Sequence, residues 1–219
     1  MKIMVFGTGN EGLRDVVKKL YPQDTFHFCS EVTSINKTFA RKVVVNEEFN
    51  LSEYDAFILT STSQIYNYLW FESCKLTWFH NPFDLRAAAN HNFYFGIASS
   101  TKFKLGESKP KFEDGKISVH REFPEGMLCK FLLLPTQVIS LSKVEMPKHL
   151  TRTCRAFLRD LRVRFGVVSF IVSDDFSFHL KEFSPILDWN NISEKNIKII
   201  FDCILFTSKV VSTSRRSVY

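Results

Sequence analysis

Two patterns of apolar and polar positions divide the chain near residue 117. Before that point, short apolar runs typical of buried strands alternate with stretches of helical spacing. The expected strands are 2–6, 25–29, 42–45, 54–59 and 75–79, and the expected helices are 11–21, 63–74 and 83–93. This alternation predicts an α/β fold with a parallel sheet, a Rossmann-like domain over residues 1–98.

Beyond residue 117 the strands follow one another with short turns between them, which favours antiparallel pairing. The expected strands are 117–123, 127–134, 137–144, 167–173 and 176–183, and the expected helices are 147–164 and 193–209. We therefore predict an antiparallel α+β domain over 117–210. The polar stretch 99–116 is expected to be a linker or a short excursion, and 211–219 a basic tail.

The helix expected at 147–164 has one apolar and one basic side. Its apolar stripe is Leu150, Cys154, Phe157, Leu158 and Leu161. Arginines recur every three or four residues along the polar side: Arg152, Arg155, Arg159 and Arg162. Such a stripe can bind the phosphates of a nucleic acid, but more often it is a solvated helix face.

Composition and charge narrow the class of protein. The chain has 219 residues, 23 of them phenylalanine, so aromatic packing should dominate the core. A net charge of +6 favours an anionic ligand or an acidic protein partner. The five cysteines lack zinc-ligand spacing, and no signal-peptide pattern or long apolar run occurs, so we expect a cytoplasmic protein without a membrane partner.

The segment "GTGNEG" places Gly7, Gly9 and Gly12 between an expected strand and an expected helix. This is the G-x-G-x-x-G arrangement of dinucleotide-binding turns, and Glu31 follows where a ribose-binding acid would lie. A plain strand-to-helix turn tolerates the same glycines. In either case we expect Gly7 or Gly9 to adopt a backbone conformation that is poor for other residues.

Several motifs together resemble the ATP-grasp ligases. "REFPEG" (121–126) matches a Glu-Phe-hydrophobic-Gly pattern of that superfamily, and "LKEFSP" (180–185) approaches its Leu-Glu-x-Asn-Pro motif. "WFHNPFDLRAAAN" (78–90) looks like the junction that follows a Rossmann-like domain in such enzymes. The resemblance implies an ATP-grasp-like C-terminal half, with ATP and Mg²⁺ as cofactors if the protein is active.

The resemblance also implies roles for particular residues. Lys130 and Glu182 would be the catalytic residues: Lys130 would neutralise phosphate, and Glu182 would hold Mg²⁺. Glu122 would bind the nucleotide together with the glycines, and Lys102 or Lys104 would have to replace lysines that the family carries elsewhere.

The chain departs from the family pattern at several of these places. Asn90-His91-Asn92 stands near one lysine position, the phosphate-covering domain seen in the family is almost entirely lacking, and Ser169 and Ser184 replace metal ligands. We therefore expect a truncated, catalytically degenerate binding or assembly protein in which Glu182 pairs with Lys130. A minimal ATP-dependent carboxylate–amine ligase and a dinucleotide-binding protein are the alternatives.

Overall fold

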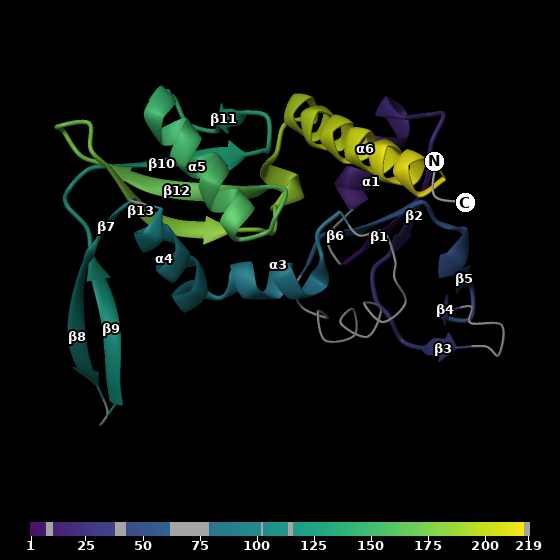
Figure 1. Cartoon of the computed structure of the whole chain (residues 1–219), viewed down its shortest axis with the longest axis horizontal. Coiled ribbons are helices and arrows are strands. Elements are labelled where there is room, and N and C mark those ends of the chain that lie inside the picture. Colours follow the sequence, from purple (N-terminus) through teal and green to yellow (C-terminus); the bar gives the residue numbers. More distant parts are fainter. Residues whose placement is uncertain (8–10, 38–42, 62–78, 102, 114–115, 217–219) are drawn as a thin grey trace. The chain divides into compact units, whose positions relative to one another are not determined.

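A computed structural model describes residues 1–7, 11–37, 43–61, 79–101, 103–113 and 116–216 (Figure 1). The chain divides into two compact units, one formed by Met1–Arg86 with Ile186–Tyr219 and the other by Ala87–Pro185. Two separate parts of the sequence therefore form the first unit, whereas we expected domain boundaries near residues 98 and 117.

The first unit contains a three-stranded parallel sheet in the order β2-β1-β6. Its elements are β1 (Lys2–Phe6), α1 (Glu11–Leu20), β2 (Thr25–Cys29), β6 (Ala56–Leu59), η3 (Trp189–Asn191) and α6 (Glu194–Arg216). Four consecutive residues of β1, Ile3 to Phe6, are fully buried, as is typical of a parallel strand covered on both faces. The parallel pairing confirms part of the expected α/β layout, while the Rossmann-like description stays a prediction.

A separate small antiparallel sheet contains the strand that we expected at 42–45. It has the order β3-β4-β5, and η1 follows it. Their bounds are β3 (Ile35–Lys37), β4 (Val43–Val45), β5 (Phe49–Asn50) and η1 (Leu51–Glu53). The expectation that 42–45 joins the parallel sheet is therefore wrong. The helix expected at 63–74 and nearly all of the strand expected at 75–79 lie outside the described residues.

Helix α6 packs within the first unit and not, as we expected, within the C-terminal domain. The Tyr21 hydroxyl donates to the Asp202 carboxylate at 2.7 Å, and Phe201 packs against the rings of Tyr21, Phe26 and Trp189. These aromatic contacts hold α6 against α1 and β2. The helix also continues through most of the expected basic tail, to Arg216. None of the helices in the described part of the chain has the length and apolarity needed to cross a bilayer.

The second unit is built on a five-stranded sheet in the order β11-β10-β12-β13-β7, in which only the β13–β7 pair is parallel. Its strands are β7 (Lys104–Leu105), β10 (Met127–Leu133), β11 (Val138–Ser140), β12 (Gly166–Val172) and β13 (Phe178–Ser184). Helices α4 (His91–Ser100) and α5 (Lys148–Asp160) pack against one face, and α3 (Pro82–Ala89) spans the boundary between the units.

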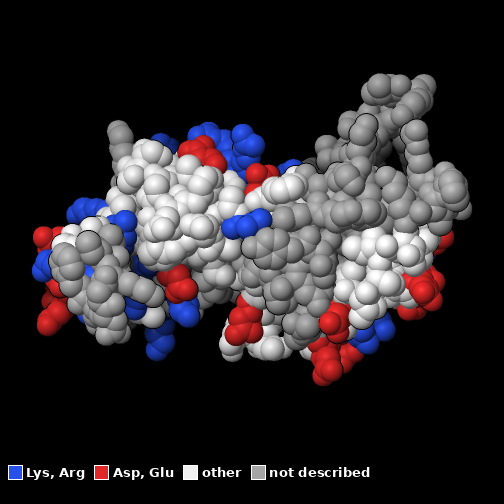
Figure 2. Space-filling model, turned by 90° about the horizontal axis from the view of Figure 1, so that it is seen from below, with Lys and Arg blue, Asp and Glu red and all other residues white. Residues whose placement is uncertain are grey.

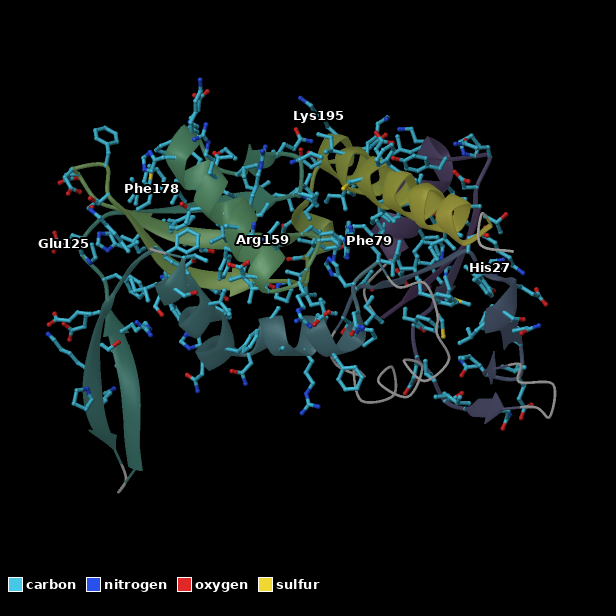
Figure 3. The ribbon with its side chains drawn as sticks, viewed as in Figure 1. His27, Phe79, Glu125, Arg159, Phe178 and Lys195 are labelled. Carbon is cyan, nitrogen blue, oxygen red and sulfur yellow. The ribbon has the colours of Figure 1, made fainter. Side chains whose placement is uncertain are left out.

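Phenylalanine rings fill the space between this sheet and its helices, as the composition predicts. Phe103, Phe131, Phe157, Phe170 and Phe178 are buried and contact one another in edge-on or tilted pairs. Phe178, labelled in Figure 3, begins β13 within this cluster. The expected apolar stripe of α5 is confirmed, because all five of its residues are buried in the same cluster.

The segment 99–116, which we expected to be a linker or a short excursion, contains β7, the whole of one hairpin strand and the first residue of the other. β8 (Glu107–Glu113) pairs with β9 (Lys116–Glu122) in a two-stranded antiparallel sheet. Lys109 forms an ion pair with Glu122 at 2.5 Å, and basic and acidic side chains mix at this end of the molecule (Figure 2). The strand expected at 117–123 is confirmed as β9.

Two further expected elements differ in extent from the structure. The helix expected at 83–93 is divided into α3 and α4 at Asn90, whose side chain caps α4 by accepting from the Phe93 amide at 3.2 Å. The strand expected at 137–144 ends at Ser140, where the hydroxyl donates to the carbonyls of Ser142 and Val144 and turns the chain.

We predict that Gly7→Ala destabilises the first unit by about 1–3 kcal/mol, measured by urea unfolding. Gly7 has φ +130°, which confirms the expected conformation, and an added Cβ would lie 2.4 Å from Thr60 Oγ1. The control is Gly12→Ala in the first turn of α1, where the nearest atom is 3.7 Å away. Because alanine favours helix, this variant should be neutral or more stable; equal losses in both variants would contradict the prediction.

Candidate functional site

Lys130, Ser169 and Glu182 form a row across three neighbouring strands. Lys130 of β10 lies opposite Ser169 of β12, and Ser169 lies opposite Glu182 of β13. Successive side chains of a strand point to opposite faces. Because Cys129 and Phe131 point into the core with α5, the row lies on the other face of the sheet. The sheet thus brings together both of the predicted catalytic residues.

A β-bulge in β13 determines that Glu182 belongs to this row. Ser169 pairs with Glu182, but the next residue, Phe170, pairs with Leu180, so Lys181 is an extra residue in the strand. Leu180 and Phe183 are consequently both buried in the core although they are three positions apart. Bulges re-aim side chains in this way. The sequence pattern gave no indication of the bulge, and it is the main feature of the site that we missed.

Glu182 and Lys130 are exposed, whereas Ser169 between them is only 4% exposed. Two strand spacings, about 10 Å, separate the strands that carry the two charges. Among the described residues neither charge takes part in an ion pair. The expected Glu182–Lys130 pair is therefore wrong.

Tyr94 and Arg121 add a phenol and a second cation near Glu182. The pKa of Tyr94 is raised, mainly because the phenol is buried. A hydrogen bond with the Phe183 backbone lowers this pKa, the charge of Glu182 raises it, and the charge of Arg121 lowers it. The guanidinium of Arg121 lies 4.2 Å from the centre of the Phe95 ring. Arg121 belongs to the "REFPEG" motif and Tyr94 follows Asn90-His91-Asn92, but the sequence analysis assigned neither residue a role in the site.

The structure separates Glu122 from this group. Its carboxylate accepts from Lys109 of the neighbouring hairpin strand, whereas Arg121, the preceding residue, turns toward α4. Neighbouring residues of a strand face opposite ways, so Glu122 and Arg121 do not share a side. The nucleotide-binding role of Glu122 remains a prediction.

A second row on the same face has two apolar residues, a histidine and a lysine. Leu128, Ile171, His179 and Lys104 lie opposite one another across β10, β12, β13 and β7. Leu128 is 44% exposed, and His179 Nδ1 is buried without a hydrogen-bond partner. Lys104 donates to the Ser177 hydroxyl at 2.7 Å, so one of the two expected replacement lysines lies near this face. The other, Lys102, lies outside the described residues.

The predicted dinucleotide-binding residues belong to the first unit. Gly7 makes a tight turn, Gly9 lies outside the described residues, and Gly12 has room for a side chain. The Glu31 carbonyl accepts from Cys29 Sγ and Asn46 Nδ2, which orders the chain after β2, while its side chain is exposed. This geometry explains Gly7 as a structural residue and leaves dinucleotide binding as a prediction.

The described residues do not fit a dedicated magnesium site. Mg²⁺ prefers octahedral oxygen ligands, commonly one or two carboxylates together with substrate phosphates. The row offers one carboxylate, a buried hydroxyl and a cation, and no group of three or more His, Cys, Asp or Glu side chains lies within metal-binding reach in the described part of the chain.

Comparisons with known proteins agree with this fold. No family model matches the sequence, and no curated protein matches it. Among solved structures, the macrocyclase MdnB from Microcystis aeruginosa MRC has 13% identity and a TM-score of 0.73, over 94% of this chain and 97% of that chain. A RiPP-associated ATP-grasp ligase from Chryseobacterium gregarium has 11% identity and a TM-score of 0.66, over 90% and 93%.

A third structure carries the same fold and a metal–nucleotide complex. The ATP-grasp ligase PsnB, complexed with minimal precursor, Mg and ADP, has 10% identity and a TM-score of 0.68, over 94% of this chain and 98% of that chain. The chain therefore has the fold of the ATP-grasp ligases, which confirms the resemblance at the level of the fold.

We predict that Glu182→Gln leaves the free energy of unfolding unchanged within about 0.5 kcal/mol in a denaturant titration. The carboxylate is exposed and has no ion pair among the described residues, so folding does not depend on its charge. The neighbouring Phe183→Ala, at a ring that is 3% exposed, should cost about 3–5 kcal/mol. A large loss in Glu182→Gln would assign that carboxylate a structural role.

The β12–β13 turn supplies a prediction on pH. Asp175 accepts from the Ser173 hydroxyl at 2.6 Å and from the Ser177 hydroxyl at 2.8 Å, and these bonds lower its pKa from 3.8 to about 2. Because the folded pKa is depressed, the stabilisation is present above pH 3.8 and is lost as the pH falls toward 2. A carboxyl NMR titration should give this low pKa, and Ser173→Ala should raise it.

Proposed function

We propose that this protein is an ATP-grasp-like binding protein for a peptide or protein partner, with phosphoryl transfer very low or lost. The observation that carries the proposal is the composition of the Lys130–Ser169–Glu182 row. This row presents one carboxylate and one lysine, whereas phosphoryl transfer depends on several groups that neutralise charge.

The route of the chain between α4 and β10 supports the same conclusion. Its described elements there are the two-residue β7 and the β8–β9 hairpin, whose charges Lys109, Glu107 and Glu122 interact with one another. Lys109 of this hairpin is already paired with Glu122, so it is poorly placed to neutralise a triphosphate. Each electrostatic contact that a transition state lacks costs about 3–4 kcal/mol, so several losses together remove most of the catalysis.

A peptide partner is supported by the solved structures and by exposed apolar side chains beside the row. Two similar structures are of MdnC bound with the precursor peptide MdnA and of PsnB complexed with the precursor peptide PsnA2. In this chain Leu128 of β10, on the same face as the row, is 44% exposed, and Phe176 in the β12–β13 turn is 80% exposed. These side chains offer apolar contacts to a peptide.

A minimal ATP-dependent carboxylate–amine ligase is the second candidate. The observation in its favour is that Glu182 and Lys130 are both exposed and have no ion pair in the described part of the chain, so both are available to a ligand. In that function Lys130 would neutralise phosphate and Glu182 would hold Mg²⁺.

A turnover assay separates the two candidates. With ATP, Mg²⁺ and a pool of peptides and amino acids, we expect no ADP release above background from the wild type, and no change in Glu182→Gln. The control is Glu125→Gln, an exposed carboxylate between β9 and β10 (Figure 3). Magnesium-dependent ADP release that disappears in Glu182→Gln alone, with an unchanged melting curve, would establish the ligase.

Peptide binding is tested by selection from a displayed peptide library. We expect an enriched group of peptides that binds the wild type and loses about tenfold or more affinity in Leu128→Lys, because a charge there disrupts the apolar contact. Glu125→Gln should bind as the wild type does. If no sequence is enriched, or if both variants lose binding equally, the peptide-binding proposal is wrong.

A further inference from the structure

Four arginines line a hollow at the C-terminal end of α5. Its volume is about 400 Å³, and it is lined by Pro135, Arg155, Leu158, Arg159, Arg162, Val163 and Arg164. The floor is apolar, since Leu158 and Val163 are only 2% and 5% exposed. Arg159, labelled in Figure 3, lies at this end of α5. No acidic residue belongs to the lining.

The four arginines come from the end of α5 and from the segment that follows it. Arg155 donates to the Thr136 carbonyl, and Arg159 pairs with the neighbouring Asp160 at 3.1 Å. A cation near the last turn of a helix also interacts favourably with the helix dipole, but that effect is confined to the last turn. Arg162 has φ 58° and lies beyond the end of α5, and Arg164 belongs to the segment that leads into β12.

We propose that this hollow binds an acidic peptide segment in which carboxylate side chains flank an aliphatic one. Guanidinium groups bind carboxylates through two parallel hydrogen bonds, and the apolar floor offers a place for one aliphatic side chain. The site lies on the α5 side of the sheet, opposite the Lys130–Ser169–Glu182 row, and the inference does not depend on the function proposed for that row.

The shape of the hollow favours a peptide over a nucleic acid. Arg152, the first arginine of the helix stripe, is not part of the lining, so the charge gathers at one end of α5 and does not follow its length. The lining also contains no aromatic side chain on which a base could stack, and stacking is a main contribution to binding of single strands.

Fluorescence anisotropy with a labelled Glu-Glu-Leu-Glu-Glu peptide tests the proposal. We expect saturable binding that weakens with salt, is absent for Gln-Gln-Leu-Gln-Gln and is weaker for Glu-Glu-Ser-Glu-Glu. Arg162→Asn, which suits a positive φ, and Arg159→Ala should each weaken binding about tenfold. Arg152→Ala removes the same charge from the same helix outside the hollow, and should change affinity by less than about twofold.

Several results would overturn this inference. Failure of the wild type to bind the acidic peptide would reject it, as would equal losses in Arg152→Ala and Arg162→Asn, which would show an effect of net charge. Displacement by a single-stranded RNA whose binding depends on Arg152 would assign the stripe to nucleic acid. Displacement by millimolar inorganic phosphate would show a simple anion site. Arg159→Lys keeps the positive charge but lacks the planar guanidinium group, so it should bind with intermediate affinity. This conservative variant shows whether the loss in Arg159→Ala comes from a folding defect.

Discussion

The packing of Phe183 over Gly166 is the contact on which the second unit depends. A Cβ at Gly166 would lie 2.4 Å from the Phe183 ring, so the glycine leaves the space that the ring fills. Burying such a ring stabilises the fold by about 1.5–3 kcal/mol, and Leu180 must be buried in the same core. Residues three apart reach the same face of a strand only if one residue is extra. The bulge at Lys181 follows from this requirement.

The bulge also determines what the open face of the sheet presents. With Lys181 as the extra residue, Glu182 lies opposite Ser169, and Lys130 completes the row. In a regular strand Lys181 would take that place, and the row would carry two cations and no carboxylate. Core packing therefore positions Glu182, although the side chain itself contributes little to stability.

The sequence predicted those elements in which apolar residues recur with regular spacing along one buried face. The apolar stripe of α5 and the β12–β13 hairpin are of this kind, and the family motifs located Glu182 and Lys130. β9 was predicted as a strand, whereas the polar sequence of β8 has no apolar alternation and was expected to be a linker or a short excursion. Periodicity shows that α6 has an apolar face but not that Tyr21 and Phe26 cover it. The bulge depends on packing between strands, which no local pattern encodes.

The distribution of charge within the second unit bears on the choice between binding and catalysis. A site for nucleotide phosphates needs cations and a metal-binding carboxylate at one point. Here the open face carries Glu182 with Lys130 in the same row, and their charges cancel, while Lys104 is engaged by Ser177. The concentrated positive charge lies instead on the α5 side, in a hollow whose lining contains no carboxylate. Our proposal of binding over catalysis rests on this arrangement of the described residues, in which the open face carries one lysine and one carboxylate in the same row while the four arginines gather on the α5 side.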